Sequence, residues 1–140
     1  MLRETPSMQK QWPLGAGIVI VRRCNDSWEV LGLKLGSLYD LPKGQMDPGE
    51  NTLSTAVRET REEASITDID FIWGKQTLKL DHLTFYIAAT SQDGKVKKNP
   101  KTSIQEHDSI KWMTWDEIEK VVFHYLRPAI SWAKKIVEEN

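Results

Sequence analysis

Three things are scarce in this sequence, and each scarcity excludes a class of protein. Cys24 is the only cysteine of the 140 residues, so no disulfide can form within the chain, and a reducing, cytoplasmic setting is expected. No apolar run approaches the roughly 20 residues of a membrane span, and residues 1–12 lack the apolar centre of a secretion signal, so we expect no membrane partner. Neither sign of charge dominates, because 19 basic and 20 acidic residues leave a net charge of −1. Such a balance argues against a stable nucleic-acid partner.

The length and composition suit a single folded domain. Of the 140 residues, 39% are hydrophobic and 28% are charged, as in ordinary globular proteins. A chain of this size can stabilise a core without a disulfide or a structural metal. We find no internal repeat and no linker, so we predict one domain over residues 1–140, with residues 1–12 as a short N-terminal arm. The sequence does not predict an oligomeric state.

The pattern of apolar residues predicts alternating strands and helices. Apolar, β-branched segments favour strands, and segments rich in helix formers without internal glycine or proline favour helices. Residues 37–49 and 91–103, rich in turn-forming or polar residues, are expected to be loops. This pattern predicts an α/β fold in which helices pack against a sheet. The expected strands are residues 15–22, 28–35, 69–73, 77–80, 83–89 and 110–113, and the expected helices are residues 53–64, 116–123 and 128–138.

A group of acidic residues in the first expected helix indicates a metal site. Positions i, i+3 and i+4 share a helix face, so Glu59, Glu62 and Glu63 should project together. Carboxylates that are this close repel one another, and a divalent cation with a preference for oxygen ligands, Mg²⁺ or Mn²⁺, would remove the repulsion. Arg58 lies four residues before Glu62 and could steady it. The alternative is a solvated helix face with weak ion pairs.

The segment before this helix favours the metal site over the solvated face. Residues 41–50 read LPKGQMDPGE, and their prolines and glycines are typical of a fixed, sharply turning loop. Such a loop can present backbone carbonyls to a metal ion and Lys43 to a phosphate group.

Loop and helix together resemble the Nudix hydrolase signature. Two positions depart from it: Thr60 stands where an aliphatic residue is usual, and Ser65 stands where glycine is usual. Thr60 still offers a methyl group to the core. If the turn at Ser65 requires a positive φ, a residue other than glycine costs about 1 kcal/mol there. The residues that match at the required spacings are Gly44, Glu50, Arg58, Glu59, Glu62, Glu63 and Ile66.

The resemblance implies a fold, a cofactor and a set of site residues. The fold would be a Nudix-type α/β/α sandwich with a mixed β-sheet, and the activity a Mg²⁺-dependent hydrolysis of a diphosphate linkage in a nucleoside polyphosphate. Glu62 and Glu63 would be metal ligands, joined by Glu59 and by the backbone carbonyl of Lys43. Arg58, counted with the catalytic residues, would brace the loop against the helix together with Glu50.

Two segments resemble one branch of the family, the bis(5′-nucleosyl)-tetraphosphatases. These are residues 41–44 and residues 106–112 (EHDSIKW). The best guess is therefore asymmetric cleavage of diadenosine tetraphosphate to ATP and AMP, with Lys43 and Tyr86 as substrate-binding residues. A tryptophan in place of Tyr86 could stack on the base. The alternatives are a Nudix pyrophosphohydrolase acting on dNTPs, ADP-ribose or capped RNA, a non-catalytic Nudix-fold nucleotide-binding module, and a plain interaction domain.

Glu106 is a further candidate, because many Nudix enzymes take a carboxylate from a distant loop as metal ligand or general base. Asp108 is its neighbour and competitor, Glu59 is the alternative base, and a solvated loop acid is the plain alternative. His82, His107 and His124 lack the spacing of a zinc site, so we expect them to be structural or surface residues.

Overall fold

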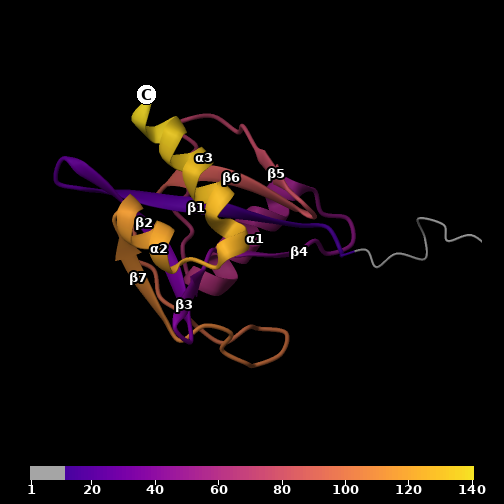
Figure 1. The fold of residues 1–140 in the computed structure, drawn as a ribbon. Helices are drawn as coiled ribbons and strands as arrows, with labels where there is room; N and C mark the ends of the chain where they lie inside the picture. The colour runs from indigo at the N-terminus through magenta and orange to yellow at the C-terminus, as the bar shows by residue number, and fades with distance from the viewer. Residues whose placement is uncertain (1–11) are drawn as a thin grey trace, which may run out of the picture.

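The computed structural model describes residues 12–140, which form a seven-stranded sheet covered by helices on both faces (Figure 1). The predicted N-terminal arm, residues 1–12, lies outside the described residues except for Trp12. The strands are β1 (Gly15–Cys24), β2 (Ser27–Leu35), β3 (Leu38–Asp40), β4 (Lys43–Gln45), β5 (Leu78–Leu80), β6 (Leu83–Ala89) and β7 (Ser109–Met113). The helices are α1 (Thr52–Ala64), α2 (Trp115–Val121), the 3₁₀ turn η2 (His124–Leu126) and α3 (Arg127–Glu138).

Strand β1 is the centre of the sheet. The main order is β3-β2-β1-β6-β5, while β4 pairs with β1 and β7 pairs with β2. Strands β1 and β6 are parallel, and the other pairs are antiparallel, so the sheet is mixed. Strand β4 therefore meets the N-terminal end of β1, where Ala16 pairs with Gly44. This pairing carries the predicted signature loop to the edge of the central strand.

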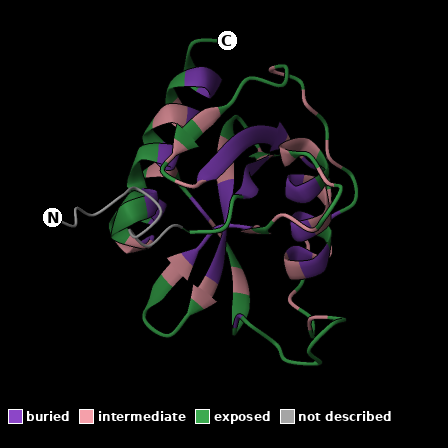
Figure 2. Ribbon diagram, turned by 90° about the vertical axis from the view of Figure 1, so that its right-hand side faces the viewer, coloured by how far each residue is buried: buried purple, intermediate pink, exposed green. Residues whose placement is uncertain are grey.

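Alternate residues of β1 face two separate cores, as the period of a strand requires. Ile18 and Ile20 belong to the core beneath α1, which also contains Ala56 of that helix. Val19 and Val21 belong to the core beneath α2 and α3. Figure 2 shows α1 and α3 on opposite sides of the sheet, each with its buried residues turned inward. The predicted α/β/α sandwich with a mixed sheet is confirmed.

Two secondary-structure predictions were wrong in part. Residues 37–49, predicted as a loop, contain the short strands β3 and β4, which form because β2 and β1 offer them free edges. Residues 69–73, predicted as a strand, make only one bridge, between Asp70 and Ala89, before a turn that the amide of Gly74 closes on Phe71. In both cases, the pairing available to the segment, and not its local composition, decided whether a strand formed. Within residues 12–140, no helix is long and apolar enough to cross a membrane.

Of the two departures from the signature, Thr60 lies in α1 and Ser65 caps the C-terminus of that helix, and their surroundings differ. Thr60 is fully buried and its hydroxyl donates to the carbonyl of Ala56 at 2.8 Å, so its polar atom has a partner. Ser65 caps the C-terminus of α1 with φ 56° and ψ 33°, the left-handed conformation that favours glycine. Its hydroxyl oxygen is buried and has no hydrogen-bond partner in the described chain. Glycine would relieve both problems at this position.

We expect Ser65→Gly to raise the free energy of unfolding by about 1 kcal/mol, because a β-carbon is disfavoured at positive φ. Urea unfolding followed by circular dichroism measures the change. Ser65→Ala is the matched control, since it removes the unpaired hydroxyl but keeps the β-carbon. A glycine variant that is less stable than the wild type would contradict the assignment of strain to this cap.

Candidate active site

The acidic face of α1 is fixed from the first turn of the helix. Asn51 caps the helix by accepting the amide of Ser54, and Ser54 accepts the amide of Asn51 in return. One turn and a half further on, Glu59 and Glu62 are buried at 8% and 9% exposure, and Glu63 is half-buried. The acidic residues therefore border the sheet, as predicted, and do not form a solvated face.

Arg58 joins the loop to this helix. Its Nε lies 2.7 Å from an oxygen of Glu50, and its Nη2 donates to the carbonyl of Gln45 at 2.8 Å. Its Nη1 donates to Glu62 at 3.0 Å and to Glu59 at 3.2 Å. The hydrogen bonds from Arg58 lower the pKa of Glu50 to about 2, and in return the pKa of Arg58 is raised. Arg58 is thus a positioning residue, because its guanidinium nitrogens are already hydrogen-bonded to these four partners.

Gly44 leaves room for the carboxylate of Glu59. A β-carbon placed at Gly44 would lie 2.1 Å from the carboxylate carbon of Glu59, closer than van der Waals contact allows. The two residues meet because β4 packs directly on α1. This contact explains why glycine occupies the first signature position. Without a side chain, the strand can approach the carboxylate of Glu59 closely.

We expect Gly44→Ala to fold but to lose turnover by roughly 10- to 100-fold, since a misplacement of about 1 Å in a catalytic site can have that effect. The flexible end of Glu59 can move away from the new methyl group, which preserves the fold but displaces the carboxylate. Steady-state kinetics and thermal unfolding, measured on the same preparation, check this. Gly36→Ala is no suitable control because Gly36 has φ 67°, so Gly32→Ala serves instead, since its added β-carbon would meet the flexible end of Met113 and no site carboxylate. Unchanged turnover in Gly44→Ala would mean that the position of Glu59 is unimportant.

Lys43 presents its backbone to the same carboxylates. Its amide donates to Glu63 at 3.1 Å, whereas the neighbouring carbonyl of Pro42 accepts from Ile18 of β1. The amide and carbonyl of one strand residue point to the same side, so the Lys43 carbonyl also faces away from β1, toward α1. The Lys43 ammonium lies 3.1 Å from Asp40. Burial acts to lower its pKa, but the charge of Asp40 outweighs this and the pKa is raised.

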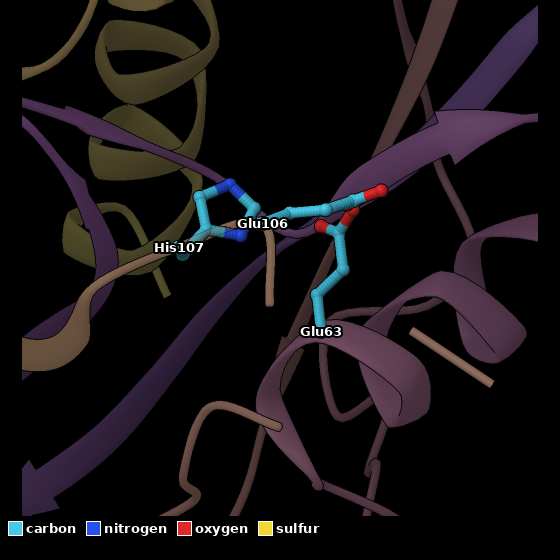
Figure 3. A group of neighbouring side chains, drawn as sticks. All are labelled: Glu63, Glu106 and His107. Atoms are coloured by element: carbon cyan, nitrogen blue, oxygen red, sulfur yellow. The ribbon is translucent and has the colours of Figure 1, made fainter. Parts of the chain in front are cut away.

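A cleft of about 380 Å³ opens beside these groups. Glu106 reaches it from the loop that precedes β7, so that a carboxylate oxygen of Glu63, one of Glu106 and a ring nitrogen of His107 lie within 4.8 Å of one another. Figure 3 shows the three side chains converging from α1 and from this loop. Asp108, the competitor, instead accepts the amide of Gly36 at 3.0 Å. The residues that line the cleft are Leu35, Asp40, Lys43, Gly44, Gln45, Glu59, Glu63, Asn99, Glu106 and His107.

The donor set fits a divalent cation. Burial raises the pKa of Glu59 to about 7 and the pKa of Glu63 to about 10. The charges of Glu62 and Glu106 also raise the pKa of Glu59, and the charges of Glu59 and Asp40 also raise that of Glu63. Ionised carboxylates are therefore disfavoured here unless positive charge is added, and a cation bound by oxygen ligands adds it. Glu59, Glu62, Glu63 and the Lys43 carbonyl remain the predicted ligands.

Tyr86 receives no support as a substrate-binding residue. It is 7% exposed, its hydroxyl bonds to Thr52 at 2.7 Å, and its ring packs edge-on against Phe71. A ring held in the core beneath α1 has no free face for a base. Sequence reasoning missed Asp40 and His107, which lie 67 positions apart and are joined only by the fold. It also missed Tyr125, which shares a second hollow of about 180 Å³ with Trp12, His82 and Lys43.

Comparison with known proteins gives consistent results. The NUDIX domain model matches residues 12–137. The asymmetrical bis(5′-nucleosyl)-tetraphosphatase of Caenorhabditis elegans is 32% identical over 119 residues, covering 76% of this chain and 80% of that protein. The rat protein of the same name is 33% identical over 92 residues, covering 54% of this chain and 55% of its own.

Solved structures share the fold. A binary complex of the C. elegans Ap4A hydrolase superposes with a TM-score of 0.74 at 24% identity, covering 90% of this chain and 99% of that chain. The NUDIX domain of Shewanella oneidensis NrtR, complexed with ADP ribose, gives a TM-score of 0.64 at 18% identity, covering 96% and 94%.

Proposed function

The chain belongs to the NUDIX domain family, and from this premise we propose that it is a metal-dependent hydrolase of nucleoside polyphosphates. One observation carries the proposal. Glu59, Glu63 and Glu106 line a single cleft together with Lys43, although they come from a helix, a distant loop and a short strand. A solvated acidic helix or a plain interaction domain would not bring a distant carboxylate and a lysine to the same hollow.

The charged residues at the site are assigned to the metal, the substrate and the attacking water. Glu59, Glu62, Glu63 and the Lys43 carbonyl would hold Mg²⁺ or Mn²⁺. A metal so bound polarises phosphate oxygens and lowers the pKa of water. The Lys43 ammonium, which lines the cleft, binds a phosphate of the substrate. Glu106 accepts the proton of the attacking water, while Glu59 remains a metal ligand.

The preferred substrate is a dinucleoside tetraphosphate, cleaved asymmetrically. The support is the similarity to the C. elegans and rat proteins named asymmetrical bis(5′-nucleosyl)-tetraphosphatases. The competing proposals within the family are hydrolysis of dNTPs, ADP-ribose or capped RNA, and a module that binds nucleotides without cleaving them. A nucleotide is the expected small-molecule partner in all of them. A cytoplasmic location is also a proposal, motivated by the single, unpaired Cys24.

We expect diadenosine tetraphosphate to give ATP and AMP in equal amounts when Mg²⁺ is present, and no products in excess chelator. Chromatography of the products, beside parallel reactions with ADP-ribose, dNTPs and capped RNA, measures this. Re-addition of Mg²⁺ after chelation is the control for irreversible loss of the enzyme. Two ADP as the sole products, or brisk cleavage of ADP-ribose alone, would assign the chain to another substrate. Nucleotide binding without turnover on any of them would favour the binding module.

A further inference from the structure

We propose that Glu63, Glu106 and His107 form a mixed nitrogen–oxygen metal site that binds transition-metal cations such as Mn²⁺ and Co²⁺ in preference to Mg²⁺. The inference rests on the proposed function in one respect, the assignment of the cleft as a metal centre. It concerns the nucleotide-free protein, in which Glu106 is a ligand; the role of Glu106 as base applies when substrate and the attacking water occupy the cleft. The inference goes beyond that function because His107 lies outside the signature helix and loop, and because it sets the identity of the metal.

The three side chains already lie at the spacing of a ligand set. One ligand atom from each lies within 4.8 Å of the other two, and Figure 3 shows the edge of the His107 ring turned toward both carboxylates. Glu63 keeps an oxygen available, because only its Oε1 accepts the Lys43 amide. The single hydrogen bond at the carboxylate of Glu106 is a long one, 3.3 Å from the amide of Asn99. Both carboxylates can therefore turn toward a shared cation.

Asp40 orients the imidazole as a ligand. His107 is 5% exposed, and its Nε2 lies 3.0 Å from Oδ2 of Asp40. Asp40 also lies 3.1 Å from the ammonium of Lys43, with which it forms an ion pair. Asp40 is thus an ionised carboxylate that can only accept, and Nε2 carries the proton. In the neutral ring the lone pair is then on Nδ1, which has no hydrogen-bond partner among residues 12–140.

This arrangement is the carboxylate–histidine pair found behind many metal-bound imidazoles. The carboxylate fixes the tautomer and the ring orientation and makes the nitrogen a better donor. His107 cannot turn away easily, because Gln105 donates to its carbonyl and Asp108 donates its amide to Lys34 of β2. Mg²⁺ prefers oxygen ligands, so a site for Mg²⁺ alone does not require a buried imidazole whose free nitrogen faces two carboxylates.

The ligand types predict the order of metal affinities. Imidazole suits first-row transition metals, whose affinity for nitrogen-containing sites rises from Mn²⁺ to Co²⁺, whereas an all-oxygen site suits Mg²⁺. Loss of the imidazole should therefore weaken Co²⁺ and Mn²⁺ binding while leaving Mg²⁺ binding nearly unchanged. The ratio of Co²⁺ to Mg²⁺ affinity in His107→Asn is expected to fall by roughly 10- to 100-fold, the range seen when a metal-site imidazole is disturbed.

The test uses the full chain loaded with one equivalent of Mn²⁺ and no nucleotide. Pulsed electron paramagnetic resonance detects a nitrogen nucleus bonded to the metal, and protein labelled with ¹⁵N only at histidine must change that signal. Isothermal titration calorimetry with Co²⁺ and Mg²⁺ gives the affinity ratio. His107→Asn should abolish the nitrogen signal, and His124→Asn, which alters an exposed histidine on η2, should preserve it.

The outcome in wild-type protein decides the proposal even if His107→Asn fails to fold. No histidine nitrogen on bound Mn²⁺ overturns the proposal, as does a signal that His124→Asn removes. A histidine signal that survives Glu106→Gln and Glu63→Gln together would also overturn it, because the metal would then be bound elsewhere. Hydrolysis of a nucleotide without nitrogen ligation refutes only the mixed site. Nitrogen ligation without hydrolysis of any nucleotide supports the mixed site and refutes the proposed function.

Discussion

Replacing Glu63 by glutamine is expected to lower turnover by about 10³-fold, which corresponds to roughly 4 kcal/mol of transition-state stabilisation. Glu63 stands at the meeting point of the site: it accepts the Lys43 amide, lines the cleft and lies within 4.8 Å of Glu106 and His107. Glutamine has the same shape, and its carbonyl oxygen can still accept the Lys43 amide. What it removes is the negative charge on which metal affinity depends.

The fold should survive this change, which makes the loss of turnover interpretable. Because burial raises the pKa of Glu63 to about 10, the ionised form is disfavoured in the metal-free fold. A neutral amide avoids that cost, so the free energy of unfolding without metal should be unchanged or higher. Thermal unfolding with and without Mg²⁺ is the measurement, since a bound cation stabilises the fold by mass action.

Glu119→Gln, which alters an exposed carboxylate of α2, is the matched control and should behave as the wild type in both assays. A Glu63→Gln variant with wild-type turnover and an undiminished stabilisation by Mg²⁺ would remove Glu63 from the metal site.

Glu106→Gln is expected to lower turnover by roughly 10²- to 10⁴-fold, the range for a positioned proton acceptor. Its charge acts on the attacking water, so KM should change much less than kcat. Glu106 is suited to this role because it is exposed in the loop before β7, yet close to Glu63 across the cleft. The pH profile of kcat, measured for the wild type and the variant, is a readout that a merely structural role would not change.

Asp108→Asn separates the two neighbouring acids. Asp108 binds the Gly36 amide and does not line the cleft, so its amide variant should retain most of the turnover. If Glu106→Gln instead keeps turnover within a few-fold and the wild-type pH profile, the role of base returns to Glu59. If Asp108→Asn shows the larger loss, the loop must rearrange when substrate binds.

The signature helix was predictable because its evidence is local. The spacing of Glu59, Glu62 and Glu63 places them on one face whatever the rest of the chain does. The strain at Ser65 could also be anticipated, since a position usually occupied by glycine signals a positive φ, and the structure has φ 56° there. Strand β6 was predicted with its correct bounds because a short run of apolar residues with β-branched and aromatic side chains favours a buried strand.

Other features could not be predicted because they depend on contacts between distant residues. Strand β4 forms because β1, which lies about 30 residues earlier in the chain, provides an edge for it, whereas its own residues are typical of a loop. Tyr86 was predicted to bind substrate because of its place after the signature. In the structure, its side chain lies on the face of β6 that packs in the core beneath α1. Strand β6 is buried on both faces, so its sequence shows no alternation that would tell which residues face α1.

The sequence by itself determined the family, the acidic helix, the loop before it and the α/β class, because each rests on spacing within one short segment. The tertiary structure alone decided which distant residues join them. It placed Glu106, but not Asp108, in the lining of the cleft, buried Tyr86 in the core, and placed Asp40 3.0 Å from His107. The physical reason is that helical and strand periods act over a few residues, whereas a metal site is completed by loops whose positions follow from the packing of the whole sheet.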